Sequence, residues 1–458
     1  MELFEHQKKA LSETEQFNKV GYFLDMGLGK TFVGSEKAIK GFKQNVVLVV
    51  CQHSKIDDWV SHFKTNYATH DHDYCCKHLI FDLSNKKDFA AFISEATEAT
   101  EATTPDYIED DWTGQTYRQE NLYPFIVVGV INYELIFRRA EILDLKDFTL
   151  MLDESSMITN PNAKRSKFIH KLNPDNVILL SGTPTGGKYE KLWSQLRLLG
   201  WNISEEAFHK NYVVKEWIED ESGFKIPIIT GYKNVERLKD KLRQHGCIFM
   251  KTEEVFDLPE MVEVPVFVNS TKEFKHFMKN CIVTLKDGTE LIGDTKLTKR
   301  LYARQLCGQF CTDKLNAFKD LVESTDDRLI VFYNFNEELS LMQNIVAEIG
   351  KPVSIVNGQT KDLEAYETES DSITFIQYQA GAMGLNLQKA NKVIYFTLPQ
   401  SSDLFEQSKK RIHRIGQKNN CFYYLLMCKN SVDEDILATL KMRKDYDDEL
   451  FIKYQENY

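Results

Sequence analysis

The sequence predicts an α/β protein in which two parallel-sheet domains flank a mostly helical stretch. In the first half of the chain, short apolar runs with the length of buried strands alternate with helix-like segments. The same rhythm returns in the last third of the chain. Strands that alternate with helices favour a parallel sheet covered by helices on both faces. The two series therefore predict two such domains.

The individual elements follow from the same patterns. The strands predicted for the first domain are residues 22–24, 46–51, 125–131, 149–152 and 177–180. Those predicted for the second domain are residues 329–333, 353–356, 373–377, 393–396 and 422–428. Between the two series, residues 272–285 and 296–310 have the amphipathic pattern of helices. The Asp287-Gly288 step predicts a turn between these two helices.

One segment of the first domain has an unusual composition. Residues 95–103 repeat Glu-Ala-Thr three times, and the acidic stretch 106–111 follows. Such a biased segment is typical of a solvated insertion, and a partner-binding role is the alternative.

Charge and cysteine content narrow the class of protein. The formal net charge is −11, which counts against a protein that merely coats nucleic acid but allows a local basic groove. No run of residues approaches the roughly 20 apolar residues that a membrane span needs, and no basic-then-apolar signal pattern opens the chain. We therefore expect the protein to stay inside the cell, in a reducing environment. None of the nine cysteines forms a CxxC pair. Cys307 and Cys311 suit one helix face, without a second pair of metal ligands nearby in the sequence.

The strongest motif follows the first predicted strand. It reads Asp25-Met26-Gly27-Leu28-Gly29-Lys30-Thr31 and opens a helical segment. Glycines let backbone N–H groups approach phosphate oxygens, a lysine reaches the β- and γ-phosphates, and a threonine holds Mg²⁺. The generic pattern has an earlier glycine where this chain has Leu24. The setting between strand and helix nevertheless indicates a nucleotide-binding loop.

A second motif follows the predicted strand 149–152. Asp153 can hold Mg²⁺ through water at the strand end, and Glu154 can orient and deprotonate an attacking water. An acidic surface turn is the alternative for this pair alone. The phosphate loop upstream favours the catalytic interpretation.

Together these motifs resemble those of the superfamily-two helicases, and the resemblance spans nearly the whole chain in the right order. Residues 181–184 (Ser-Gly-Thr-Pro) resemble the third motif, and residues 3–7 resemble the glutamine motif, whose Gln7 would read adenine. Further similar segments are residues 47–63 (motif Ia), 130–134 (motif Ib), 329–333 (motif four), 379–387 (motif five) and 407–417 (motif six). The ending Arg411-Ile412-His413-Arg414-Ile415-Gly416-Gln417 is typical of the Swi/Snf-type branch.

The resemblance implies an architecture. Residues 1–200 and 327–432 would be RecA-like domains with ATP at their cleft. Residues 201–326 would be the helical insertions that grip duplex DNA in this branch, and residues 433–458 a C-terminal helical brace. The chain resembles compact bacterial or viral members of the branch. We therefore expect it in the cytoplasm of a bacterium or of a virus-infected host, or in the nucleus if its source is eukaryotic.

The resemblance also implies a mechanism. ATP and Mg²⁺ would be the cofactors, with Thr31 and Asp153 holding the metal. Residues expected to bind nucleotide are Gln7, Met26, Gly27, Leu28, Gly29, Lys30, Thr31, Gly384 and Asn386. Residues expected to act in hydrolysis are Lys30, Glu154, Gln407, Arg411 and Arg414. The resemblance therefore implies that the protein is a monomeric motor that moves along duplex DNA. Phosphate contacts carry no sequence information, so its movement should tolerate any sequence.

Motif six has a rationale of its own. Arg411 and Arg414 are three residues apart, so on a helix they would share one face. Two guanidinium groups in fixed positions suit the charge of a transferring phosphoryl group. A solvated basic helix that includes Lys409 and Lys410 is the alternative.

Two alternative functions stay open. One is a helicase that separates the strands of DNA or RNA. The other is a non-enzymatic scaffold, against which the intact Lys30, Asp153 and Glu154 argue.

The chain also departs from its relatives. Motif two reads Asp-Glu-Ser-Ser where many relatives have Asp-Glu-Ala-His, so Ser156 stands at the place that often links ATP to nucleic acid. Residues 397–402 lack the acidic residue and the tryptophan usual there. Four tryptophans are candidates either for the core or for stacking on bases, with Trp59 the best stacking candidate: Trp59, Trp193, Trp201 and Trp217.

Overall fold

The computed structural model describes residues 2–42, 44–67, 78–102, 106–109, 116–119, 126–219, 225–381 and 385–451. The chain divides into two units. The second covers Phe256–Asp445, and the first consists chiefly of the chain before it. Within the described ranges, no helix is long and apolar enough to cross a membrane.

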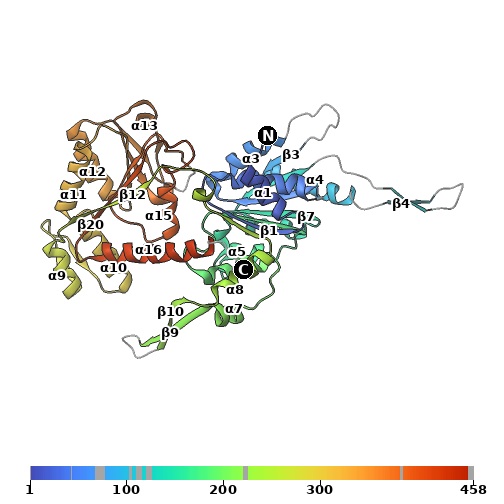
Figure 1. Cartoon of the computed structure of the whole chain (residues 1–458), viewed down its shortest axis with the longest axis horizontal. Helices are drawn as coiled ribbons and strands as arrows, with labels where there is room; N and C mark the ends of the chain where they lie inside the picture. The colour runs from blue at the N-terminus through green and yellow to red at the C-terminus, as the bar shows by residue number, and fades with distance from the viewer. Residues whose placement is uncertain are drawn as a thin grey trace. The chain divides into compact units, whose positions relative to one another are not determined.

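The first unit is built on a seven-stranded sheet with the order β11-β1-β8-β7-β2-β6-β3, in which all neighbours are parallel. Its strands are β1 (Lys19–Leu24), β2 (Val46–Cys51), β3 (Leu79–Asp82), β6 (Val127–Asn132), β7 (Phe148–Asp153), β8 (Asn176–Ser181) and β11 (Cys247–Met250). Its helices are α1 (Glu5–Glu13), α2 (Lys30–Glu36), α3 (Ile56–Tyr67), α4 (Lys86–Ala102), α5 (Lys164–Ile169), α6 (Leu192–Leu198), α7 (Glu205–Tyr212) and α8 (Val235–Gln244). Helices lie on both faces of this sheet (Figure 1).

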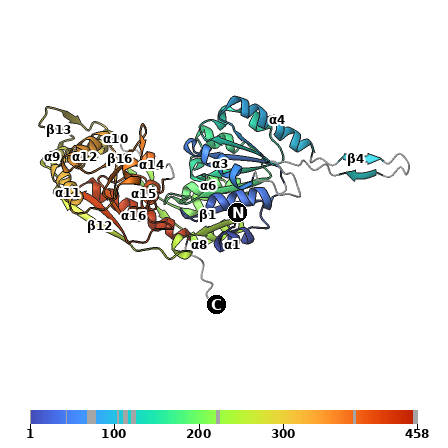
Figure 2. The same ribbon diagram turned by 90° about the horizontal axis from the view of Figure 1, so that it is seen from above.

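The second unit repeats the plan with a sheet of the order β12-β20-β19-β15-β18-β16-β17. Its strands are β12 (Met261–Val268), β15 (Leu329–Tyr333), β16 (Val353–Val356), β17 (Lys361–Asp362), β18 (Ile373–Gln377), β19 (Lys392–Tyr395) and β20 (Cys421–Cys428). Only the short β17 pairs antiparallel. Its helices are α9 (Lys272–Asn280), α10 (Lys296–Cys307), α11 (Thr312–Glu323), α12 (Asn336–Ile349), α13 (Glu364–Thr368), α14 (Tyr378–Gly381), α15 (Ser402–Lys409) and α16 (Val432–Phe451). Helices α11 and α12 lie side by side (Figure 2).

The predicted α/β class with two parallel sheets is confirmed. Each strand predicted from an apolar run overlaps a strand of one of the two sheets. The core strands β2 and β15 are buried along their whole length, as expected for strands covered on both faces.

The stretch between the two predicted domains, expected to be mostly helical, contains strands as well as the helices α7 to α11. The four-residue β11 joins the first sheet and β12 joins the second, each as an edge strand. Among the described residues, two antiparallel strand pairs of this stretch lie outside the sheets, β9–β10 (Val213–Glu219, Lys225–Tyr232) and β13–β14 (Ile282–Thr284, Glu290–Ile292). A further pair, β4–β5 (Asp106–Glu109, Thr116–Gln119), belongs to the chain before this stretch. An edge strand is short or half exposed, so it lacks the continuous apolar run that reveals a central strand.

The helix predicted over residues 272–285 stops early for a local reason. It ends at Asn280, because Cys281 adopts a left-handed backbone with φ 60°. The chain then forms the β13–β14 hairpin, and the predicted turn at Asp287-Gly288 lies at its tip, where Gly288 has φ 85°.

The Glu-Ala-Thr repeat is helical up to Ala102, at the end of α4. Ala96 and Ala99 are buried in the core of the first unit together with Phe89 and Phe92. A spacing of three residues places the alanines on one helix face. The prediction of a solvated insertion is therefore wrong for the described part of the repeat, whose last residue, Thr103, lies outside the described residues.

Three buried cysteines meet in the core of the second unit. Cys307 is the last residue of α10 and Cys311 precedes α11, so the prediction that they share one helix is wrong. The helix ends because Gly308 leaves helical geometry at its C-cap. Cys428, at the end of β20, places its Sγ 3.6 Å from the Sγ of Cys311.

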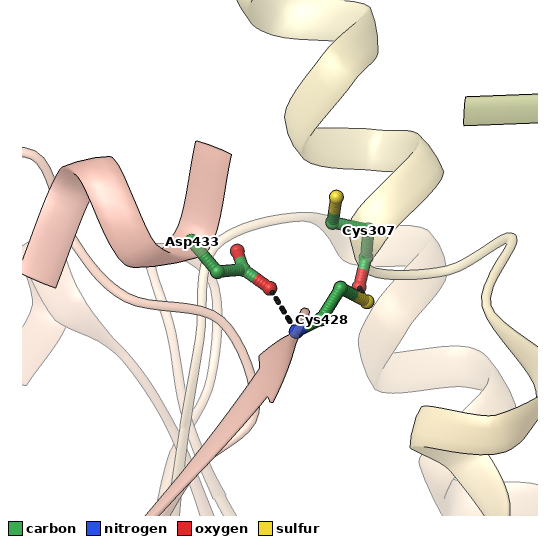
Figure 3. Close-up of side chains that lie close together, drawn as sticks. All are labelled: Cys307, Cys428 and Asp433. Atoms are coloured by element: carbon green, nitrogen blue, oxygen red, sulfur yellow. Dashed lines mark hydrogen bonds between the residues drawn. The ribbon is translucent and has the colours of Figure 1, made fainter. Parts of the chain in front are cut away.

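The fold also brings a carboxylate to this place (Figure 3). Ligand atoms of Cys307, Cys428 and Asp433 lie within 4.8 Å of one another, which the sequence spacing had not revealed. Asp433 Oδ2 accepts hydrogen bonds from the Cys428 backbone N–H at 3.0 Å and from the fully buried Lys314 Nζ at 2.7 Å. Burial lowers the pKa of Lys314, but the charge and hydrogen bond of Asp433 together with the nearby Cys428 and Cys307 raise the pKa on balance. Losing one partner of such a buried pair costs about 3–5 kcal/mol. The ion pair thus anchors α11 to the start of α16.

Candidate functional site

The predicted phosphate loop connects β1 to α2. Gly27 and Gly29 have φ of 89° and 74°, a left-handed region that favours glycine. Lys30 begins α2, and its Nζ donates to the backbone oxygens of Leu24, at 2.9 Å, and Asp25, at 3.4 Å. The ammonium group is thereby held over the loop, and the two glycines leave the loop backbone uncovered by side chains of its own.

Helix α1 packs its glutamine against this loop. Gln7 is buried, and its Nε2 donates to the Leu28 backbone oxygen at 3.2 Å. The ring Nε2 of His6 lies 3.0 Å from the same oxygen. A Cβ at Gly29 would lie only 2.2 Å from the Gln7 amide nitrogen, so any side chain there would displace Gln7, and the φ of 74° favours glycine as well. The predicted glutamine motif and the phosphate loop are therefore in direct contact.

The two predicted carboxylates lie at the end of β7. Asp153 is the last residue of the strand, and its Oδ2 accepts a hydrogen bond from Trp59 Nε1 at 2.8 Å. Burial raises the pKa of Asp153, while the Trp59 hydrogen bond and the charge of Lys30 act in the opposite direction. The positive charge of Lys30 therefore stabilises the ionised form of Asp153 at the carboxyl end of the strands.

Glu154 has a strained backbone. Its φ of 52° and ψ of 59° lie in the left-handed region, which costs a non-glycine residue of order 1–3 kcal/mol. Ser181, the first residue of the Ser-Gly-Thr-Pro motif, directs its Oγ to Glu154 Oε2 at 3.5 Å. Such strain is concentrated at functional sites. The turn aims the Glu154 side chain toward the end of β8.

A second connection joins these two motifs, and the sequence did not indicate it. The buried Ser155 Oγ donates to Gln195 Oε1 at 2.7 Å. The other end of that amide, Gln195 Nε2, donates to the Pro184 backbone oxygen at 2.7 Å. Ser156, at the place of the usual histidine, is only partly buried. Motif two is thus linked to motif three through Ser155 as well as through Glu154.

The stacking role considered for Trp59 is contradicted. Trp59 is 2% exposed and packs its ring against Phe63 at a centroid distance of 5.7 Å. Trp193 is also buried, with its Nε1 donating to the Ile203 backbone oxygen at 2.8 Å. Trp217, on the β9–β10 hairpin, is 66% exposed.

Motif six is not a helix that carries both arginines on one face, and that prediction is wrong. Helix α15 ends at Lys409, whose backbone oxygen accepts from both Tyr423 OH at 2.9 Å and the His413 backbone N–H at 3.3 Å. Arg411 and Arg414 follow in turns, before Gly416 with its φ of 96°. Gln407 lies on α15 and is partly buried.

The alternative of a solvated basic helix is also contradicted. Lys409 is buried and forms an ion pair with Glu263 on β12 at 2.7 Å. Arg411 is 6% exposed. Arg414 is partly buried, and its Nη1 donates to Asn386 Oδ1. Burial lowers the pKa of Arg414. The segment is fixed in the fold, as a functional segment would need to be.

The motif-five region is described only in part. Asn386 is exposed apart from its bond to Arg414, and Gly384 lies outside the described residues. The unusual segment after Phe396 is well anchored. Thr397 Oγ1 donates to the buried Glu338 at 2.9 Å, and Tyr378 OH donates to the Thr397 backbone oxygen at 2.9 Å. Burial raises the pKa of Glu338.

Comparison with known proteins gives two family matches. Residues 9–314 match the SNF2-related domain, and residues 313–416 match the helicase conserved C-terminal domain. A mouse protein, SWI/SNF-related matrix-associated actin-dependent regulator of chromatin subfamily A member 1, is 24% identical over 360 residues, 69% of this chain and 33% of its own. The DNA repair and recombination protein RAD26 of Saccharomyces cerevisiae is 23% identical over 495 residues, 95% of this chain and 45% of its own.

Among solved structures, the chain is similar to the Sulfolobus solfataricus SWI2/SNF2 ATPase core in complex with dsDNA. The TM-score is 0.42 at 18% identity, with 98% of this chain and 92% of the other covered. The matches to the two curated relatives span between a third and a half of their own lengths.

Proposed function

Because this chain belongs to the SNF2-related family, we propose that it is an ATP-driven motor that moves along duplex DNA. The observation that carries the proposal is the meeting of Lys30, Asp153 and Glu154 at one edge of the first sheet. Strands β1, β8 and β7 are parallel neighbours, so their carboxyl ends lie together. Ligands of α/β sheets bind at the carboxyl ends of the strands.

The residues at this edge suit ATP hydrolysis. The backbone of Met26 to Gly29 would cradle the phosphates, and Lys30 would neutralise the β- and γ-phosphate charge. Glu154 would orient the attacking water and take its proton, with Ser181 fixing the carboxylate. Gln7 would bind the adenine end of the nucleotide from α1.

The same edge fits Mg²⁺. A carboxylate from Asp153 and a hydroxyl from Thr31 are hard oxygen donors, which this ion prefers. When bound, the ion would neutralise charge that develops on the transferring phosphoryl group. The residues that would hold it lie at the strand end of β7 and in the first turn of α2.

The second unit would contribute Arg411 and Arg414. A guanidinium group keeps its charge and offers a planar fork to phosphate oxygens. Asn386 already holds the Arg414 guanidinium, and Gln407 lies on the helix that leads into the motif. We assign these residues to stabilising the transition state.

The DNA preference has support in the local charge of the second unit. Residues 272–300 carry seven lysines and arginines against four acidic residues, although the whole chain has a net charge of −11. Six of the seven are exposed: Lys272, Lys275, Lys279, Lys286, Lys296 and Arg300. An exposed basic surface binds phosphates whatever the base sequence.

The proposed function is tested by steady-state ATPase assays with duplex DNA, single-stranded DNA and RNA. Duplex DNA should stimulate turnover most, with little dependence on its sequence. Stimulation at limiting DNA should fall steeply with salt, because binding to phosphates releases counterions. Stimulation by RNA or single strands but not by duplex would favour a strand-separating helicase. A strong preference for one short site would contradict the motor altogether.

A further inference from the structure

Trp59 makes a contact that its burial alone does not require. Its indole N–H donates to Asp153 Oδ2 at 2.8 Å, across 94 residues of sequence. The ring is stacked on Phe63 and meets the edge of His62 at a centroid distance of 5.8 Å. Both partners of the hydrogen bond are therefore held by packing, and the carboxylate has a fixed neighbour behind it.

The helix that carries Trp59 is tied to the helix that carries Lys30 and Thr31. On α2, Ser35 Oγ is hydrogen-bonded to His62 Nε2 at 2.9 Å and to Tyr67 OH at 3.0 Å. Tyr67 OH also lies 3.1 Å from Glu36 Oε2. Helix α3 thereby bridges the phosphate-loop helix and the end of β7. Few of these bonds would be needed merely to bury an aromatic ring.

We propose that Trp59 is a positioning residue that orients the Asp153 carboxylate for divalent metal binding. The inference rests on the proposed function, which gives Asp153 its metal. A carboxylate has about four lone-pair sites, so one bond from an indole leaves room for a cation. Partners that orient a metal ligand in this way commonly contribute tenfold or more to affinity, on the order of 10–100-fold.

The contact also requires a tryptophan at this position and not another residue type. Phenylalanine preserves the stacking on Phe63 but has no N–H, and histidine or lysine would not fill the same volume. Motif Ia would thus serve the metal site through Trp59, in addition to any role of its neighbours toward nucleic acid.

The test is the variant Trp59→Phe, with Trp193→Phe as the matched control. Trp193 is a buried indole of the same unit whose N–H also donates, but to the Ile203 backbone oxygen. Both substitutions remove one buried hydrogen bond, so a merely structural loss affects both. We would measure binding of Mn²⁺ to the protein–ADP complex by electron paramagnetic resonance, and ADP binding without metal by calorimetry.

Trp59→Phe should weaken Mn²⁺ binding by about tenfold or more, with metal-free ADP affinity unchanged. Trp193→Phe should leave both unchanged. If Trp59→Phe does not fold, replacement by benzothienylalanine keeps the ring shape and exchanges N–H for sulfur, with the same expected result. Mn²⁺ affinity within twofold of wild type in a folded variant would overturn the inference alone. A wild-type protein that binds neither ADP nor Mn²⁺ would instead overturn the proposed function.

Discussion

Lys30→Ala is expected to reduce DNA-stimulated ATP turnover to near the background rate while the protein stays folded. The Lys30 ammonium is held over the loop by two backbone oxygens, which places a preorganised positive charge where phosphates would lie. Removing one preorganised group of this kind costs about a hundred- to a thousandfold in turnover. The measurement is steady-state ATPase activity at saturating duplex DNA.

The matched control for this variant is Lys40→Ala. Lys40 lies in the segment that continues α2, is exposed, and forms a surface ion pair with Glu36 at 2.7 Å. Such pairs contribute about 0–1 kcal/mol, so this variant should hydrolyse ATP normally. Thermal unfolding would confirm that both variants fold. Near wild-type turnover in folded Lys30→Ala would contradict the proposal that this loop binds the phosphates of ATP.

Arg414→Ala is expected to lower turnover by at least about a hundredfold, the scale of an arginine that stabilises phosphoryl transfer. ATP affinity should change by only a few-fold, because such an arginine acts mainly on the transition state. DNA binding without nucleotide should survive. Arg411→Ala should behave similarly, but Arg411 is buried, so Arg414 carries the test. Binding of a fluorescent ATP analogue separates affinity from turnover.

Two further variants sharpen this prediction. Arg414→Lys should restore little activity, because a point charge cannot copy the planar fork that donates to Asn386. Lys418→Ala, at an exposed basic residue just beyond the motif, should have no effect. Equal ATPase activity of the wild type and Arg414→Ala would show that the segment is only a structural turn.

The central strands of both sheets could be predicted from sequence because each is largely apolar. The runs at residues 46–51 and 329–333 coincide with β2 and β15. The edge strands β11 and β12 could not be predicted, since an edge strand is short or partly exposed. The Glu-Ala-Thr repeat in α4 was wrongly predicted to be solvated for a different reason. Ala96 and Ala99 are small enough to pack against the core, although their neighbours in the sequence are polar.

The sequence predicted which residues make up the candidate site, but not which of them contact one another. The phosphate loop is local in sequence, so its glycines and Lys30 could be recognised directly. The hydrogen bond between Trp59 and Asp153 joins residues far apart in sequence, and no local pattern reveals it. The left-handed backbone of Glu154 is equally hidden, because tertiary contacts such as that with Ser181 sustain it. Motif six was wrongly predicted to be helical, because the spacing of Arg411 and Arg414 does not reveal that α15 ends at Lys409.

The most direct test of the central claim, ATP-driven movement along duplex DNA, is displacement of a third strand from a triplex at the end of a long duplex. The wild-type protein should displace the third strand with ATP, after a delay that grows with the length of duplex to be crossed, and should leave the duplex strands paired. Glu154→Gln should bind ATP and DNA but displace nothing. ATP hydrolysis stimulated by duplex without displacement of the third strand would contradict the account.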